Sequence, residues 1–141
     1  MQKLRIALVA LLLLPIVNSC IPDTHHPVPF VHVDFAINVE SPHVLALNAI
    51  HGHAIFSGGY AGIIIFRRSI DEFVAFDRAC PHHPFDPCGR INQINTPIAT
   101  CTCCQSSFLM LDGNIISGPS RFPLKTYRAS FQHPWLRITN W

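Results

Sequence analysis

The sequence predicts a single small all-β domain, and three observations support this prediction. From Phe30 onward, apolar residues alternate with polar ones or form short runs, which is typical of strands. No segment after residue 20 shows the sustained 3.6-residue period of an amphipathic helix. The 12 prolines and seven glycines suit many short strands joined by tight turns. The 141 residues leave room for one domain with a modest core.

The first half of the domain is expected to contain three strands. Val31–Ile37 alternates apolar residues with polar or small ones, so it predicts a half-buried strand. Ile63–Phe66 is apolar throughout and follows turn-rich residues 57–62, which indicates a strand buried on both faces. Glu72–Asp77 predicts the strand that leads to Cys80.

The second half is expected to contain a hairpin and two closing strands. Phe108–Leu111 and Asn114–Ile116 flank Asp112-Gly113, a dipeptide that suits a type I′ turn. Residues 124–131 and 135–139 supply the last strands.

The N-terminus predicts export. Lys3 and Arg5 precede Ile6–Val17, an apolar run broken only by Pro15. This run of about twelve residues is shorter than the roughly 20 that span a bilayer. A positive start, a short apolar stretch and small residues after it are typical of a secretory signal peptide, here residues 1–19.

Cys20 predicts a lipid anchor, because the residues before it resemble a bacterial lipobox. We therefore expect residues 20–29 to be a lipid-anchored tether and residues 30–141 to be the domain. The protein would lie in the bacterial cell envelope, held to a membrane through its N-terminal lipid and facing the periplasm or the exterior. The alternative is an ordinary signal peptide, with Cys20 as a leftover thiol.

The charge balance argues against a nucleic-acid partner. Removal of Lys3 and Arg5 with the signal leaves eight of the ten basic residues, against eight acidic ones. A net charge near zero, without a basic run, lacks the electrostatic footprint of nucleic-acid binding.

Two short pairs of soft ligands suggest a metal centre. Cys80 and His82 are two residues apart, and Cys101 and Cys104 are three apart. Ligands at such spacing can face one metal from a single loop, and two loops supply the four ligands of a [2Fe–2S] cluster or a structural zinc.

Residues 76–127 resemble a Rieske domain. That family carries Cys-Pro-His in one loop and Cys-Pro-Cys-His-Gly-Ser in the other, then an Asp-Gly hairpin and a Gly-Pro loop. The resemblance implies three stacked antiparallel sheets, with two metal-binding loops at one tip. The matching segments are Cys80-Pro81-His82, residues 101–108 (Cys-Thr-Cys-Cys-Gln-Ser-Ser-Phe), Leu111-Asp112-Gly113, Ser117-Gly118-Pro119 and residues 123–127.

The departures from the family pattern bear on redox chemistry. Cys104 stands where the family has its second histidine ligand, so the site would hold three thiolates and one imidazole. The extra negative charge disfavours the reduced state and implies a lower reduction potential. Phe108, in place of a tyrosine of high-potential members, acts in the same direction. Ser106 matches the serine that donates to a cluster sulfur, whereas Gln105 replaces a glycine and is expected to crowd the loop.

The resemblance also implies a disulfide between the two loops. Cys103 matches one of its positions in some Rieske proteins, and the position of its partner is occupied by Phe85. Cys88, three residues further on, is the candidate partner. Two alternatives stay open: Cys88 replaces His82 as a ligand, or the cysteines close as disulfides and no metal binds.

The expected function is therefore electron transfer through a [2Fe–2S] cluster held by Cys80, His82, Cys101 and Cys104. His82 would be the exposed ligand at which a redox partner protein docks. The remaining residues leave no room for a separate catalytic domain, so we expect a carrier or an oxidoreductase subunit and not a complete enzyme. The alternative is a degenerate Rieske fold, with zinc or disulfides, that acts as a structural or binding module.

Overall fold

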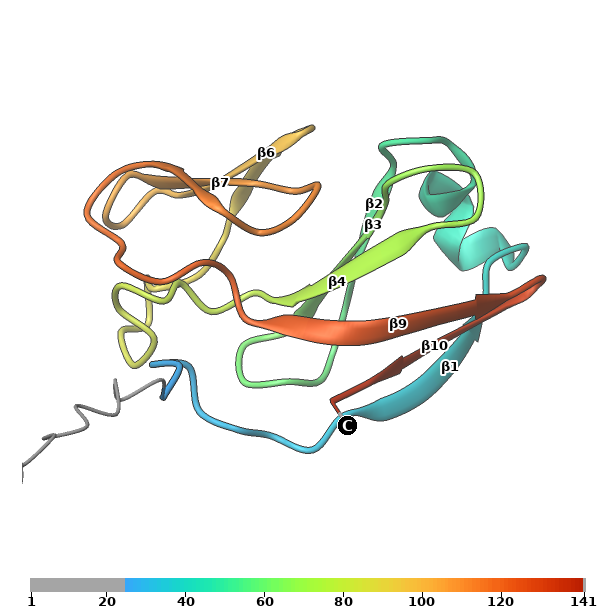
Figure 1. The fold of residues 1–141 in the computed structure, drawn as a ribbon, viewed down its shortest axis with the longest axis horizontal. Coiled ribbons are helices and arrows are strands. Elements are labelled where there is room, and N and C mark those ends of the chain that lie inside the picture. The colour runs from blue at the N-terminus through green and yellow to red at the C-terminus, as the bar shows by residue number, and fades with distance from the viewer. Residues whose placement is uncertain (1–24, 141) are drawn as a thin grey trace, which may run out of the picture.

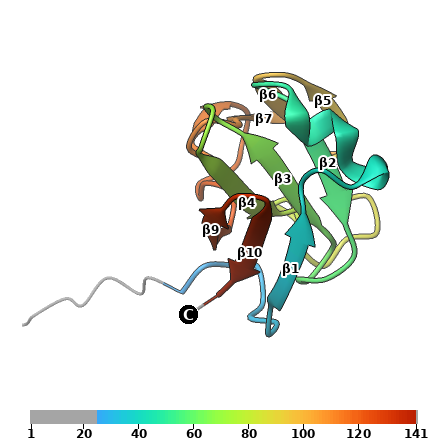
Figure 2. The same cartoon turned by 90° about the vertical axis from the view of Figure 1, so that its right-hand side faces the viewer.

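The structure, a computed structural model, describes residues 25–140, which form antiparallel sheets and one short 3-10 helix (Figures 1 and 2). The all-β class predicted from the sequence is confirmed. In chain order the elements are β1 Asp34–Asn38, η1 Pro42–Asn48, β2 His53–Phe56, β3 Ile63–Arg67, β4 Phe73–Asp77, β5 Gln93–Asn95, β6 Ile98–Cys101, β7 Ser106–Leu109, β8 Ile115–Ser117, β9 Thr126–Gln132 and β10 Trp135–Thr139.

The described strands form two sheets and not the expected three. The larger sheet has the order β1-β10-β9-β4-β3-β2, and the smaller one has the order β5-β6-β7-β8. The long strand β9 explains the difference. Its first residues, Thr126 and Tyr127, pair with β4, whereas residues 128–132 pair with β10. One strand thus joins what would otherwise be two sheets, and Figure 1 shows β9 between β4 and β10.

Strand β3 is buried on both faces, as its apolar run predicts. Its residues 63–66 have no exposed surface. Ile63 and Ile65 belong to a core that lies against β1, β10 and η1. Ile64 and Phe66 point the other way and belong to a second core, shared with the smaller sheet. A strand that is covered on both faces needs no polar face, which explains why residues 63–66 are all apolar and do not alternate with polar residues.

The predicted hairpin forms between β7 and β8, but its turn is not type I′. A type I′ turn needs both central residues in the left-handed region. Only Gly113 adopts it here, with φ 80°, and its N–H donates to the carbonyl of Leu109. The carboxylate of Asp112 accepts from the N–H of Asn114 at 2.9 Å, so the turn is a longer loop stabilised by a side chain.

The short helix η1 and the late start of β1 were not predicted. η1 has seven residues with a kink at Val44, and it buries only Val44 and Leu47, so its sequence shows no helical period. The first strand begins at Asp34 because the side chain of Asn140 binds the preceding backbone. Its amide accepts from the N–H of Val33 and donates to the carbonyl of Val31.

The segment expected to be a tether contacts the domain from His26 onward. Val28 is buried, and the Lys125 ammonium donates to the carbonyls of Val28 and Pro29 at 3.2 and 2.7 Å. The predicted signal peptide and Cys20 lie outside the described residues. Within residues 25–140, no helix combines the length and the apolar character needed to cross a membrane.

Candidate metal centre

The first loop of the candidate site begins directly after β4 and is closed at its base. The N–H of Cys80 donates to the carbonyl of Gly89 at 2.8 Å, and Ala79 bridges to Arg90. A side chain at Gly89 would place its Cβ 1.7 Å from the carbonyl oxygen of His83, so the close return of the chain requires glycine. This closure fixes Cys80 at the bottom of the loop, fully buried in the second core.

A buried carboxylate, Asp77, holds the start of this loop. It has no exposed surface and accepts hydrogen bonds from the N–H groups of Tyr60, Ala61 and Ala79 and from the hydroxyl of Tyr127. Burial raises the pKa of Tyr127, and the bond to Asp77 adds to the rise, so the phenol stays a donor. The turn before β3 and the start of the first loop are thereby connected through one side chain.

The second loop is the tight turn between β6 and β7. Cys101 ends β6 and pairs with Ser106 at the start of β7, so Cys104 lies on the turn between them. The N–H of Gln105 donates to the carbonyl of Cys101 at 2.8 Å. Gln105 adopts φ 61°, in the left-handed region that favours glycine. Its side-chain amide donates to the carbonyl of Thr102 at 2.7 Å, and the side chain is exposed. Glutamine in place of glycine therefore affects the backbone conformation of the loop, and its side chain points to solvent without crowding the site.

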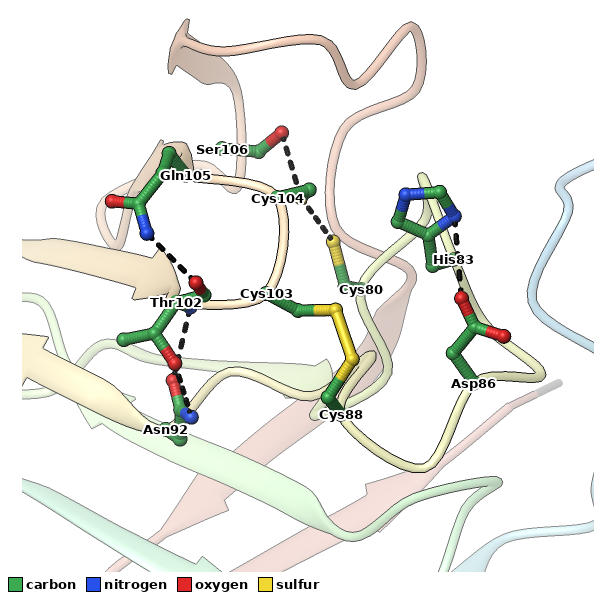
Figure 3. The surroundings of a disulfide bond; sticks show 10 residues. All are labelled: Cys80, His83, Asp86, Cys88, Asn92, Thr102, Cys103, Cys104, Gln105 and Ser106. Atoms are coloured by element: carbon green, nitrogen blue, oxygen red, sulfur yellow. Dashed lines mark hydrogen bonds and ion pairs between the residues drawn. A yellow bond between two sulfur atoms is a disulfide. The ribbon is translucent and has the colours of Figure 1, made fainter.

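Three cysteine thiols from the two loops converge. The sulfur atoms of Cys80, Cys101 and Cys104 all lie within 4.8 Å of one another. The Cys80 and Cys104 sulfurs are 3.5 Å apart. A dashed line marks this contact in Figure 3. Cys80 and Cys101 are buried, and Cys104 is half-buried, so the group lies at the edge of the second core. Three sulfur donors arranged in this way can bind a soft metal ion or an iron–sulfur cluster.

The surroundings give two of these thiols opposite acidities. Burial raises the pKa of Cys80 to about 12, and contacts with the Cys101 and Cys104 thiols add to the rise. Burial also raises the pKa of Cys104, but its hydrogen bonds with Ser106 and its contacts with the neighbouring thiols outweigh burial, so the pKa of Cys104 is lowered. Of these two, Cys104 therefore loses its proton first, and the thiolate is the form that binds metal.

Ser106 connects the second loop to a third segment of the chain. Its buried hydroxyl lies 3.2 Å from the Cys104 sulfur and accepts from the N–H of Ser120 at 3.1 Å. Gly118 allows this approach. A Cβ on Gly118 would lie 2.4 Å from the Cα of Ser106, and its φ of 96° is in the glycine region. The serine predicted to contact the cluster is thus placed beside Cys104.

His82 is not part of the group of three sulfurs. Among the described residues, the three sulfurs form the one group of potential metal-ligand atoms that lie within 4.8 Å of one another, and no nitrogen of His82 belongs to it. The His82 ring is half-buried and lies 4.0 Å, centroid to centroid, from the ring of His83. His83 in turn faces Asp86 at 3.5 Å. The ligand role of His82 stays a prediction.

A disulfide joins the two loops beside the thiols. Cys88 and Cys103 are bonded, with an S–S distance of 2.08 Å and a Cα–Cα distance of 5.6 Å (Figure 3). This is the pairing proposed from the resemblance. The alternative that makes Cys88 a metal ligand is not what the structure shows, because the Cys88 sulfur is already bonded.

The donor set fits a [2Fe–2S] cluster in its chemistry. Such clusters are held by cysteine thiolates, and imidazole replaces some thiolates in Rieske centres. Three thiols on two loops, with His82 beside Cys80 in sequence, supply these donor types in the required number. Phe108 is fully buried in the second core and carries no hydroxyl. The fold and the site define a small all-β protein with a cluster of three cysteines between two loops that could hold a metal.

The comparisons with known proteins identify the family. Residues 31–128 match the model of the Rieske [2Fe-2S] domain, so the chain belongs to this family. No curated protein matches the chain.

Solved structures of Rieske-type ferredoxin systems are among the similar ones. A complex of reduced oxygenase and oxidized ferredoxin in carbazole 1,9a-dioxygenase is 16% identical, with a TM-score of 0.49, over 64% of this chain and 82% of that chain. The Sphingomonas yanoikuyae B1 ferredoxin is 18% identical, with a TM-score of 0.46, over 62% and 83%. The E. coli protein NirD is 17% identical, with a TM-score of 0.42, over 64% and 84%.

Two residues that shape the site were missed in the sequence. Asp77 was seen only as the end of a strand, and Gly118 only as part of a matching Gly-Pro pair. An isolated acidic residue three positions before the first cysteine was the available signal for Asp77. Its three backbone donors and the Tyr127 hydroxyl lie up to 50 residues from Asp77 in the sequence, so only the folded chain reveals its role.

Proposed function

We propose that this protein is an envelope-anchored, one-electron carrier that holds a [2Fe–2S] cluster with Cys80, Cys101, Cys104 and His82. The observation that carries the proposal is the convergence of three thiols from two loops in a domain of the Rieske family. The cluster, when bound, supplies the one-electron chemistry. The residues of the chain bind it, shield it and tune its charge.

Each residue has a defined task in this proposal. Cys80 and Cys101 lie at the buried side of the site, where they exclude water from the metal. Contacts with Ser106 help to lower the pKa of Cys104, and the Ser106 hydroxyl can turn to donate to the sulfur once the Cys104 proton is lost. Cys104 takes the place of the family's second histidine, which adds one negative charge and lowers the reduction potential.

The partner is proposed to be a redox protein that docks over the first loop. His82 and Cys104 are half-buried, so this side of the site is the one that reaches solvent. Phe85, on the same loop, is 73% exposed and lies edge-on to Tyr60 at 6.1 Å. An exposed aromatic side chain beside a redox site is a typical anchor of a protein interface.

The envelope location rests on the N-terminal sequence. A basic start, an apolar run at Ile6–Val17 and Cys20 after small residues support export and lipid modification. The interloop disulfide fits an oxidising compartment. The mass of the mature protein from a bacterial membrane fraction tests this part. A diacylated Cys20 at the new N-terminus supports it, and an unmodified cysteine contradicts it.

One experiment tests the cluster. The chain without its signal is purified anaerobically, and its iron, sulfide and zinc contents and visible spectrum are measured. We expect about two irons and two sulfides per chain, with absorbance that bleaches on reduction. Cys101→Ser should abolish this absorbance, whereas Ser107→Ala, on the neighbouring strand β7, should retain it. An unchanged spectrum in Cys101→Ser would contradict the ligand assignment.

The spacing of the sulfurs favours a second candidate, a zinc-holding binding module. Around a tetrahedral zinc with Zn–S bonds of about 2.3 Å, two sulfurs lie about 3.8 Å apart. The Cys80 and Cys104 sulfurs are 3.5 Å apart, and all three sulfurs lie within 4.8 Å of one another, which is close to this geometry. One zinc per chain, without iron or sulfide, would support this candidate. Absence of any metal, with fewer than three free thiols in the denatured protein, would instead indicate further disulfides.

A further inference from the structure

The N-terminal segment of the described chain lies on a face of unusual composition. We call residues 25–30 the docked segment. It runs beside residues 121–128. The Nε2–H of His26 donates to the carbonyl of Pro123 at 3.0 Å, and the His26 ring lies 6.0 Å from the ring of Phe122. Because that carbonyl can only accept, Nε2 carries the proton. Val28 is buried beneath, so the segment has a fixed place on the domain.

The face around the docked segment combines cations with exposed aromatic side chains. We define it by Phe30, Arg121, Phe122, Lys125 and Arg128. Phe30 is 70% exposed and Phe122 is 37% exposed, and the Lys125 ammonium lies 5.6 Å from the Phe30 ring. A cavity of about 420 Å³ opens between Phe30, Lys125 and Arg128. This is the composition of a surface that meets lipid headgroups, where aromatic rings enter the interface and cations meet phosphates.

The charges of this face are not neutralised within the protein. Across residues 25–140, no ion pair involves Arg121 or Arg128, and both side chains are exposed. Residues 113–141 contain no acidic side chain. The face is therefore complementary to an anionic surface, although the mature chain as a whole is close to neutral.

The chain that precedes the docked segment leads to the predicted anchor. Cys20 lies six positions before His26, and a fully extended chain of this length reaches about 20 Å. A lipid on Cys20 would thus hold the docked segment within about 20 Å of the bilayer. The face begins where the anchored chain meets the domain, so it is the part of the domain nearest to the lipid.

We propose that the face formed by Phe30, Arg121, Phe122, Lys125 and Arg128 rests on an anionic phospholipid bilayer. This proposal deepens the proposed function and rests on its lipid anchor for the location of the protein. The face also lies near the metal centre. Ser120, next to Arg121, donates to the Ser106 hydroxyl, which lies 3.2 Å from the Cys104 sulfur. Figure 1 places the docked segment at the end of the molecule that carries the two loops. Contact with the bilayer would hold the metal centre close to the membrane surface.

Vesicle binding tests the face separately from the anchor. The chain from residue 20, with Cys20→Ser to prevent lipid attachment, is sedimented with vesicles of phosphatidylcholine alone or with phosphatidylglycerol. We expect binding to the anionic vesicles that weakens as salt rises, and little binding to phosphatidylcholine. The double variant R121E/R128E should weaken binding at least tenfold, because each arginine near an anionic membrane surface increases the affinity about fivefold. The pair F30S/F122S should weaken it several-fold.

Matched variants control for charge and exposed aromatic area. R68E/R90E changes the net charge by the same amount at two exposed arginines outside the defined face, and W135S removes an exposed ring at the turn between β9 and β10. Both should bind like the parent chain, and thermal unfolding checks that all variants fold. No binding by the parent chain, or equal losses in the controls, would overturn the lipid assignment and leave the face to a protein partner.

The mass of the mature protein and the vesicle binding of the Cys20→Ser chain distinguish failure of the lipid anchor from failure of the membrane-binding face. If the mature protein carries no lipid on Cys20 but the Cys20→Ser chain still binds anionic vesicles, the anchor is wrong and the face stands. If Cys20 is lipidated and the Cys20→Ser chain binds no vesicles, the anchor stands and the face is wrong.

Discussion

Single residues decide the chemistry of the candidate site. Cys104 is the residue that most distinguishes this chain from the pattern it resembles, and it is also the thiol whose pKa the fold lowers. The turn that carries it depends on two unusual backbone positions. Gln105 adopts a left-handed conformation, and Gly118 leaves space for the backbone of Ser106. The cysteine with the lowered pKa is thus placed at the solvent side of a buried site.

Cys104→His restores the second histidine and should raise the reduction potential of the bound cluster. A neutral imidazole replaces a thiolate, so the reduced state carries one negative charge fewer, and we expect a shift on the order of 100 mV. A spectroscopic redox titration measures it. Cys104→Ala is the control and should lower cluster occupancy. An unchanged potential in Cys104→His would mean that residue 104 does not bind the metal.

Gly118→Ala should destabilise the domain and disturb the second loop. The added Cβ would lie 2.4 Å from the Cα of Ser106 and 2.8 Å from its nitrogen, and these are backbone atoms that cannot move away freely. We expect a loss of at least about 2 kcal/mol in the free energy of unfolding. Gly58→Ala is the matched control, because Gly58 also has positive φ but its nearest neighbour is 3.4 Å away. Equal losses of stability in the two variants would show that the positive φ causes the loss, and that the contact of the new Cβ with the Ser106 backbone does not add to it.

At the scale of elements, three segments determine where the site lies. The loop after β4 and the end of β6 bring the Cys80 and Cys101 sulfurs within 4.8 Å of each other in the second core. The docked segment then covers the edge of residues 121–128, and His26 links it to the carbonyl of Pro123. The loop that carries Ser120 is held between the docked segment and Ser106.

The docking of this segment should depend on pH through His26. Burial lowers the pKa of His26 below 6.5, so the unfolded chain takes up a proton at a higher pH than the folded one. The folded state therefore loses stability as the pH falls from 6.5 toward the folded pKa. Thermal unfolding between pH 7.5 and 5 should show this decrease, and His26→Gln should reduce its slope. The same slope in both proteins would assign it to other groups.

At the scale of the whole molecule, the chain surrounds the strongly buried strand β3 with two cores. One core lies under β1, β10 and η1, and the other lies under the smaller sheet and contains two of the three thiols. The disulfide between Cys88 and Cys103 then links the loop after β4 to the turn of the smaller sheet. The candidate metal site lies at the junction of these parts, so its geometry depends on the complete fold.

Removal of the disulfide should destabilise the whole domain and not only the loops. The bond closes a segment with a sequence separation of 15, which corresponds to about 3 kcal/mol in the chain-entropy estimate. Cys88→Ser with Cys103→Ser should lower the free energy of unfolding by roughly this amount in urea titrations. The double variant also avoids reductants, which would affect the metal. A change below about 1 kcal/mol would indicate that the bond does not restrict the unfolded chain as the entropy estimate assumes.

The sequence by itself determined the features that are local in the chain. Alternation and apolar runs predict the all-β class and the buried strand at residues 63–66, and the cysteine spacing predicts two loops with soft ligands. These patterns arise from strand periodicity and from the reach of a short loop, and neither requires knowledge of distant contacts. The ligand roles of individual residues and the lipid anchor stay predictions.

Only the tertiary structure decided the features that depend on contacts between distant segments. The convergence of Cys80 with Cys101 and Cys104, the role of Asp77 and the continuity of the sheet through β9 join segments that are 20 to 50 residues apart. The docked segment lies 97 residues before its partner Pro123. Such contacts depend on how the elements pack, because side-chain spacing along one strand or loop carries no information about its neighbour in space.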